Sequence, residues 1–126
     1  MLHQFTFKNF KSFKEETTLD MLASSIKEHP HDVVMDVMEE KVLKVAAIYG
    51  ANASGKSNVI EAFAAMKNMV LYSFRQNVFS TKNDIEPHWF EDKNVPTEFN
   101  VIFSTEGDIY QYGFSVLEGV ILEEYL

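Results

Sequence analysis

The feature that most constrains the fold of this chain is an eight-residue segment in which Gly50, Gly55, Lys56 and Ser57 keep a fixed spacing. Its pattern is Gly, any four residues, Gly, Lys, then Ser or Thr, and it requires a loop between a strand and a helix. An apolar run over 44–49 precedes it and predicts a buried strand. Apolar residues recur every three or four positions from Ser57 to about Phe74, which predicts a helix.

The loop pattern is that of a phosphate-binding loop, or Walker A motif. Its glycines let the backbone turn tightly and come close to phosphate oxygens. Lys56 is expected to be the catalytic cation between the β- and γ-phosphates, and Ser57 the ligand of Mg²⁺. The sequence therefore predicts binding of ATP with Mg²⁺. The predicted nucleotide-binding residues of the loop are Gly50, Ala51, Asn52, Ala53, Ser54, Gly55, Lys56 and Ser57.

The rest of the chain has the pattern of β-structure. Alternating aromatics in residues 2–13, interrupted at Asn9, predict a strand, a kink and a second strand, and a further strand is expected at Thr17–Met21. Residues 75–97 form a predicted connection in which Trp89 and Phe90 pack against apolar surface. The turn at 106–108 predicts a β-hairpin between strands at 99–103 and 110–114, with a third strand over 120–126.

Composition limits the functions that this sequence supports. The 126 residues fit a single domain with a packed core, and the net charge of −8 argues against unaided, non-specific binding to nucleic acid. Three lysines without an acid in residues 1–14 form an end that could face phosphate. No apolar run approaches the ~20 residues of a membrane span, and there is no cysteine, so we expect a cytoplasmic protein without a membrane partner.

Several other features have a structural explanation that outweighs a functional one. Phe5, Phe7, Phe10 and Phe13 could stack on a base, but as strand aromatics they are expected to fill the core. His29-Pro30-His31 fits an exposed turn better than a pair of metal ligands. The methionines at 66 and 69 are expected to pack within the helix interface.

The opening Phe7-Lys8-Asn9-Phe10-Lys11-Ser12-Phe13, combined with the loop and the Asn58 that follows it, resembles the amino-terminal half of an ABC-type ATPase head. The similar groups are SMC and RecF-like proteins, overcoming-lysogenization-defect nucleases, and AAA-type ATPases of abortive-infection and phage-defence systems. Ala53 stands where SMC proteins have Gly, which favours the defence-type group. The resemblance adds Asn58, Lys11 and Ser12 to the expected nucleotide-binding residues.

The fold that this resemblance implies is α/β, a partial P-loop NTPase with a strand–P-loop–helix unit and an antiparallel β-subdomain. No apolar strand ending in Asp-Glu (Walker B) and no Ser-Gly-Gly signature occur in the sequence. We therefore expect residues 1–126 to be one truncated amino-terminal lobe. The full-length parent would be an ATP hydrolase that acts as a homodimer, on nucleic acid or with an effector protein.

Two alternatives to this leading hypothesis remain open. The chain could be a non-catalytic module that binds nucleotide, or that binds a partner through its acidic hairpin. It could also be a small-molecule kinase, which needs a lid with several arginines, whereas the sequence has Arg75 alone.

Overall fold

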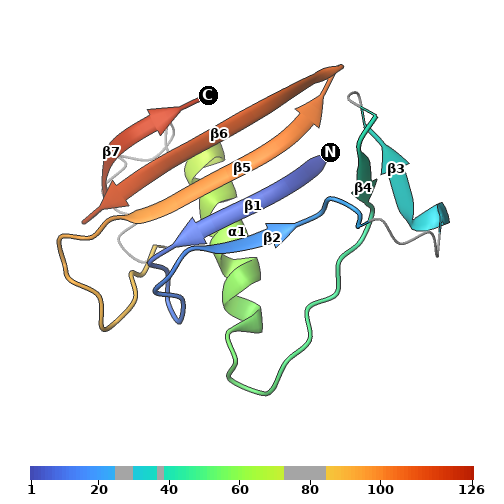
Figure 1. Ribbon diagram of the computed structural model, residues 1–126. Coiled ribbons are helices and arrows are strands. Elements are labelled where there is room, and N and C mark those ends of the chain that lie inside the picture. The colour runs from blue at the N-terminus through green and yellow to red at the C-terminus, as the bar shows by residue number, and fades with distance from the viewer. Residues whose placement is uncertain (25–29, 37–38, 73–84) are drawn as a thin grey trace.

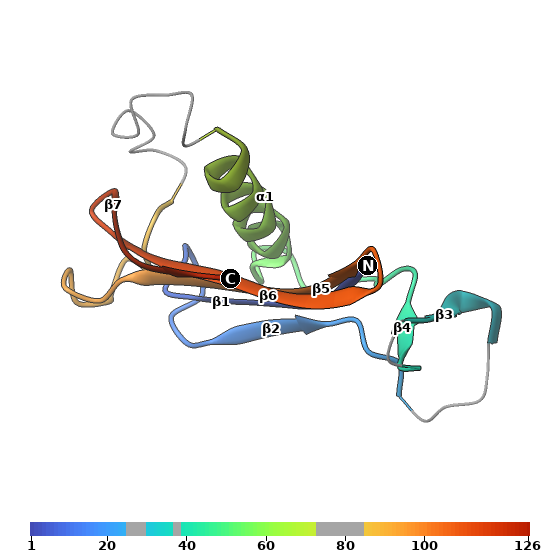
Figure 2. The same ribbon diagram turned by 90° about the horizontal axis from the view of Figure 1, so that it is seen from above.

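The structure is a computed structural model that describes residues 1–24, 30–36, 39–72 and 85–126. In these ranges it is a mixed α/β fold with a five-stranded antiparallel sheet, a two-stranded antiparallel sheet and one long helix. The strands are β1 (Leu2–Lys8), β2 (Thr17–Asp20), β5 (Thr97–Thr105), β6 (Asp108–Leu117) and β7 (Val120–Tyr125), in the spatial order β2-β1-β5-β6-β7. Helix α1 (Lys56–Tyr72) lies against one face of this sheet (Figures 1 and 2).

The core forms where alternate residues of the sheet meet α1. Phe5, Phe7, Phe99 and Phe114 are each at most 2% exposed and stack in a row across β1, β5 and β6. From the helix, the buried side chains are Val59, Ala62, Ala65 and Met66, with Met69 partly buried. These helix side chains pack in one cluster with the aromatic row, so the expected packing roles of the phenylalanines and of Met66 are confirmed.

Both hairpins of the sheet use two-residue turns of the kind that suits twisted strands. Glu106 and Gly107 connect β5 to β6, and Glu118 and Gly119 connect β6 to β7, all with positive φ. Two consecutive residues with positive φ match the right-handed twist of the flanking strands. The predicted hairpin, the third strand over 120–126 and the strand at Thr17–Met21 are therefore confirmed.

A separate pair of short strands, β3 (Val33–Met35) and β4 (Lys41–Leu43), lies beyond the end of β2 (Figure 1). It follows a short 3₁₀ turn, η1 (Pro30–Asp32), in which His31 is exposed, as expected of a turn; His29 lies outside the described residues. Val42 of β4 is 1% exposed and bridges to Leu22. This bridge joins the small sheet to the chain that leaves β2.

The predicted second strand after the kink at Asn9 is wrong. Asn9 and Lys11 have φ of 52° and 48°, so the backbone reverses instead of extending. Phe10 and Phe13 exchange backbone hydrogen bonds of 2.8 Å across a two-residue turn. The kink itself is confirmed, and it turns Ser12 toward α1.

The predicted buried strand over 44–49 does not form. The segment is exposed along its length, with Val45 at 77% and Tyr49 at 90%, and no backbone hydrogen bond joins residues 45–49 to another described residue. A strand needs neighbouring strands to satisfy its backbone polar groups. The segment instead runs as a free arm from β4 to the start of α1 (Figure 1).

One further prediction about packing differs from the structure, and the predicted helix is confirmed over the described residues. Trp89 and Phe90 are 89% and 84% exposed, so they are not packed against apolar surface. The helix ends at Tyr72 within the described residues, and its predicted last turn at 73–74 lies outside them. Ile60, Val70 and Leu71 are about half exposed or more, so the outer side of α1 carries apolar residues that no described residue covers fully.

Candidate functional site

The loop from Gly50 to Gly55 leads directly into the first residue of α1, Lys56. Ala53 has φ of 62° and Gly55 has φ of 89°, with Ser54 at negative φ between them. Alternation of this kind turns successive N–H groups toward one concave side, a nest that suits an anion. The N-terminus of α1 adds the unpaired N–H groups and positive dipole end that every helix start carries.

The Lys56 side chain folds back over the loop. Its ammonium donates hydrogen bonds to the carbonyl oxygens of Gly50 at 2.9 Å and Ala51 at 2.5 Å. It therefore lies inside the loop's concavity, where it adds one positive charge. Ser57, next along the helix, is exposed and its hydroxyl is accessible from solvent.

At Gly50 and Gly55, neighbouring side chains approach the backbone so closely that a Cβ would overlap them. A Cβ on Gly50 would lie 2.7 Å from Ser54 Oγ. A Cβ on Gly55 would lie 2.6 Å from Ser12 Oγ and 3.1 Å from the Phe13 ring, at a φ that disfavours other residues. The turn after β1 thus packs directly on the loop at Gly55.

Ser12 and Asn58 join this turn to the helix. The Asn58 side-chain amide donates a hydrogen bond of 2.8 Å to Ser12 Oγ. The Asn58 backbone N–H donates to the Gly55 carbonyl at 2.9 Å, which tightens the first turn of α1. The structure therefore brings together the loop, Asn58 and Ser12, and their binding of a nucleotide stays a prediction.

Lys11 is close to the site, but it is held by an acid. Its ammonium lies 2.6 Å from a carboxylate oxygen of Glu61, one turn after Ser57 on α1. The other lysines of the opening are also paired, Lys8 with Glu98 at 3.5 Å and Lys14 with Glu91 at 3.6 Å. The lysine-rich opening is thus largely neutralised by acids that lie far away in the sequence.

Mg²⁺ fits this donor set. Within the described ranges no group of three or more His, Asp or Glu side chains gathers to hold a metal ion. Mg²⁺ bound with a nucleotide needs few protein ligands, because phosphate oxygens and water complete its octahedral shell. Within this loop the Ser57 hydroxyl would supply one such ligand, and P-loop sites commonly add an acidic residue from elsewhere in the protein.

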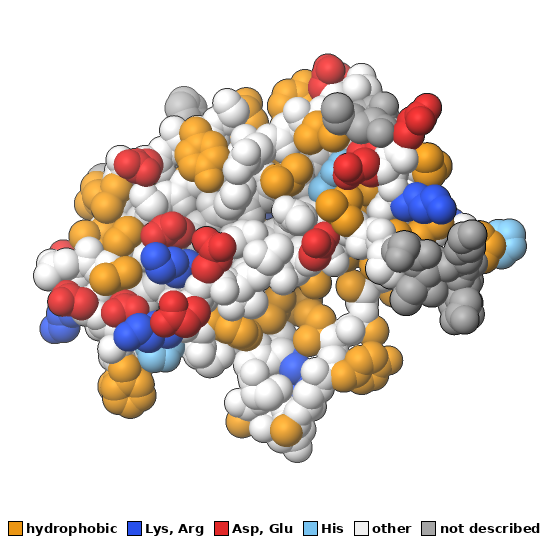
Figure 3. All heavy atoms as spheres, in the orientation of Figure 1, with side chains coloured by type: hydrophobic (Ala, Val, Ile, Leu, Met, Phe, Trp, Pro, Cys, Tyr) orange, Lys and Arg blue, Asp and Glu red, His pale blue; other side chains and the backbone are white. Residues whose placement is uncertain are grey.

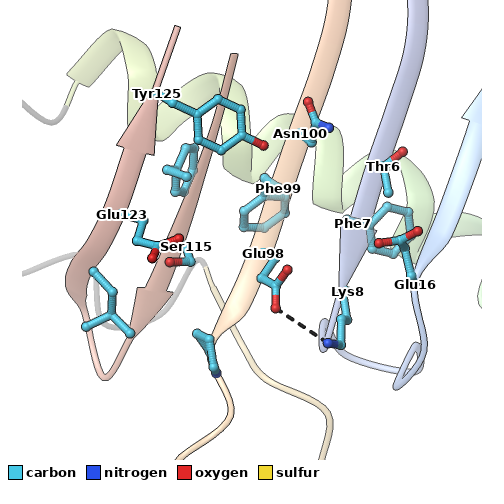
Figure 4. A pocket seen from close by; sticks show the side chains of 13 residues that line it. Thr6, Phe7, Lys8, Glu16, Glu98, Phe99, Asn100, Ser115, Glu123 and Tyr125 are labelled. Atoms are coloured by element: carbon cyan, nitrogen blue, oxygen red, sulfur yellow. Dashed lines mark hydrogen bonds and ion pairs between the residues drawn. The ribbon is translucent and has the colours of Figure 1, made fainter. Parts of the chain in front are cut away.

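The other face of the sheet, in view in Figure 3, carries a depression of about 410 Å³. Thr6, Lys8, Glu98, Asn100 and Ser115 point into it in Figure 4, and Tyr125 lies over Gly113. A second depression of about 720 Å³ lies between α1, residues 85–97 and the turn after β6. Neither includes a residue of the loop, and Lys8 of the first is paired with Glu98.

A second polar cluster lies in the core near the start of β1. His3 Nε2 is 3.0 Å from Ser104 Oγ and 3.3 Å from the Asp36 carboxylate. A hydrolytic triad needs the acid and the nucleophile on opposite ring nitrogens, whereas both contacts here use the same one. His3 is also 3% exposed, so this cluster is structural.

Two residues with a part in the site were not predicted from the sequence. Asn9 anchors the turn that contains Ser12, and Glu61 holds Lys11. The position of Glu61 four residues after Ser57 on a predicted helix is the signal that could have indicated it. The contacts of Asn9 lie near residue 90 and leave no local signal.

The family comparison agrees with this geometry. A family model described as "AAA domain, putative AbiEii toxin, Type IV TA system" matches residues 45–125, which is more than half of the chain. The match includes the loop, α1 and the hairpin strands. No curated protein matches the sequence. The described helix is not long and apolar enough to cross a membrane.

Proposed function

We propose, from the premise that the chain belongs to this family of AAA domains, that it binds ATP with Mg²⁺ through Gly50–Ser57. The observation that carries the proposal is the placement of Lys56, whose ammonium folds over the loop at the N-terminus of α1. In this concave site a triphosphate would exchange the contacts of the ammonium with two carbonyls for contacts with anionic oxygens.

Each residue of the loop has a role in this proposal. The backbone N–H groups of residues 51–55 would cradle the phosphates, with the Ser54 N–H exchanging its 3.3 Å bond to the Ala51 carbonyl for a phosphate oxygen, and Gly50 admits the tight turn. Lys56 offsets the charge on the β- and γ-phosphates, in the ground state and during transfer, and Ser57 binds Mg²⁺. Asn58 and Ser12 fix the loop from the side, and Lys11 approaches the nucleotide once Glu61 releases it.

Hydrolysis would need a carboxylate that polarises the attacking water, and the sequence has no apolar strand ending in Asp-Glu. We therefore propose that hydrolysis occurs when a further part of an SMC/RecF-like or phage-defence-type ATPase, beyond these 126 residues, covers the exposed arm 45–49 and the outer side of α1. Such an assembly would act in the cytoplasm as a homodimer around nucleotide, with an effector protein or nucleic acid as its target.

The test of nucleotide binding is calorimetry of the wild-type chain and of Lys56→Ala with MgATP. The wild type is expected to bind and Lys56→Ala to lose at least tenfold in affinity, because the ammonium is the main positive charge inside the loop. Lys67→Ala is the matched control, since Lys67 is exposed on the same helix away from the loop. Equal affinity in the wild type and Lys56→Ala would remove the assignment.

One observation favours the alternative, a non-catalytic module. Segment 45–49, directly before the loop, is exposed and forms no backbone hydrogen bond with another described residue. A module of this kind would bind MgATP without turnover in every assembly that it forms. Phosphate release, measured on the 126-residue chain and separately on its full-length parent, distinguishes the two functions.

A further inference from the structure

Asn9 lies at the point where the chain leaves β1, and it is fully buried. Its side-chain oxygen accepts a hydrogen bond of 2.8 Å from the backbone N–H of His88. Its side-chain nitrogen donates to the carbonyl oxygens of Val95 at 2.8 Å and Pro96 at 3.3 Å. Its own carbonyl accepts from the Thr97 hydroxyl at 2.8 Å. Asn9 thus forms hydrogen bonds with both ends of one connecting segment, residues 88–97.

These bonds fix the turn that follows. The Asn9 N–H donates to the Lys14 carbonyl, and Phe10 and Phe13 exchange hydrogen bonds inside it. The turn is therefore closed on itself and fastened at Asn9, and the Lys11 N–H adds a second attachment by donating to the Glu86 carbonyl at 2.8 Å. Its tip carries Ser12, whose Oγ is 2.8 Å from the Asn58 amide nitrogen.

The same turn presses on Gly55. Ser12 Oγ and the Phe13 ring occupy the volume that a Cβ at Gly55 would fill. Gly55 has φ of 89°, and this conformation directs the last N–H groups of the loop before α1 begins. A neighbour that fills this volume limits how far the loop can relax.

We infer that Asn9 is a positioning residue of the nucleotide site: it anchors the turn 10–13 to residues 88–97 and so holds Ser12 and Phe13 against Gly55. The inference rests on the proposed function, MgATP binding by Gly50–Ser57. Asn9 acts through the turn and is not itself a ligand of the nucleotide.

The choice of asparagine follows from two requirements at this position. Its φ of 52° lies in the left-handed region, which Asn and Gly adopt more readily than other residues. Its side chain also has to accept one hydrogen bond and donate two in a site without water access. Gly meets the first requirement and not the second, so Asn9→Gly removes the anchor and keeps the backbone conformation.

The experiment compares Asn9→Gly with Ser104→Ala, which also removes a buried hydrogen bond, at the other end of β5. The first readout is the NMR positions of the Gly55 backbone amide and the Asn58 side-chain amide in the nucleotide-free chain. Both resonances are expected to move in Asn9→Gly and to stay in place in Ser104→Ala. The second readout is MgATP affinity, expected about five- to tenfold weaker in Asn9→Gly alone.

A double-variant cycle separates positioning from general destabilisation. If Asn9 acts through the turn, Asn9→Gly/Ser12→Ala binds MgATP as weakly as the weaker single variant, and the losses do not add. Additive losses would overturn the inference. If Asn9→Gly fails to fold, Thr97→Val replaces it, because it removes one anchoring bond and conserves volume.

Failure of the inference and failure of the proposed function have different signatures. A folded Asn9→Gly whose Gly55 and Asn58 amides keep their wild-type resonances overturns the inference, whatever its MgATP affinity. A wild type that binds no MgATP removes the proposed function. The resonance shifts of the nucleotide-free chain would then still show whether Asn9 positions the loop.

Discussion

The Asn58 side-chain amide donates a hydrogen bond of 2.8 Å to Ser12 Oγ, and this bond ties the first turn of α1 to the bend after β1. The two residues come from opposite ends of the P-loop resemblance, the opening motif and the position after the loop. Their contact places the bend after β1 directly against the loop Gly50–Ser57.

Gly55→Ala is expected to destabilise the chain by about 1–3 kcal/mol, because alanine at a φ of 89° is strained and its Cβ would overlap Ser12 Oγ. Urea denaturation measures this loss. The matched control is Ala53→Gly, which relieves a Cβ at the other left-handed position of the loop and is expected to leave stability unchanged or slightly higher. Equal stability of Gly55→Ala and the wild type would contradict the contact at Gly55.

Glu61→Gln is expected to strengthen MgATP binding about two- to threefold at low salt, because it releases Lys11 toward the anionic phosphates. Stability should change by less than about 1 kcal/mol, since the pair is partly exposed. Glu98→Gln is the control, because it breaks a similar ion pair, with Lys8, that faces the depression on the other side of the sheet. Weaker binding by Glu61→Gln would mean that the carboxylate itself helps to hold the nucleotide.

Tyr112 is expected to make the fold sensitive to alkali. Partial burial raises the pKa of its phenol well above the usual value near 10, and the hydrogen bond and charge of Glu124 add to the shift. Above pH 10 the unfolded chain loses the Tyr112 proton first, so it binds fewer protons than the folded chain and stability falls as pH rises. Below pH 10 the contribution of Tyr112 to the free energy of unfolding is fully present.

Tyrosinate absorbance during an alkaline titration measures this shift. Tyr112→Phe should remove the latest-titrating tyrosine, and Glu124→Gln should move its step to lower pH, because the charge is lost and a hydrogen-bond partner is kept. An unchanged titration in both variants would show that Tyr112 is not the shifted group.

The uncovered apolar surface formed by residues 45–49 and the outer side of α1 is expected to cause self-association of the 126-residue chain. Tyr49→Ser/Ile60→Gln should reduce it, as measured by sedimentation velocity across a range of concentrations. Trp89→Ser is the matched control, an equally exposed aromatic on another loop. A control that reduces association as strongly would place the contact elsewhere.

The parts of the fold that the sequence predicts correctly are those whose determinants are local. The β5–β6 hairpin follows from alternation and from the turn at Glu106-Gly107, and the first residues of α1 follow from the loop pattern and helical spacing. The resemblance gave Ser12 and Asn58 as nucleotide-binding residues, and their hydrogen bond to each other was not expected. Local patterns thus account for the β5–β6 hairpin and for the start of α1.

The parts that differ depend on partners far away in the sequence. The run 44–49 has the composition of a buried strand, but none of the strands in the described ranges pairs with it, and its apolar residues are exposed. The pairing of Lys11 with Glu61 and the anchoring of Asn9 by residues 88–97 are decided by tertiary structure. Trp89 illustrates the converse, since an aromatic side chain does not by itself predict burial.

The position of β1 inside the sheet has a consequence for how the chain is made. β1 is synthesised first, yet one of its two neighbours, β5, begins at Thr97, so the pairing of Phe7 with Phe99 waits for most of the chain. Contacts so distant in sequence slow folding. Until β5 leaves the ribosome, the phenylalanines at 5, 7 and 10 have no aromatic partner from β5 or β6. The nascent chain then exposes a hydrophobic segment of the kind that chaperones bind. A chain cut back to the family-matched region, which begins at residue 45, would lack β1. It would therefore lack Phe5 and Phe7, the half of the aromatic row that β1 contributes to the core.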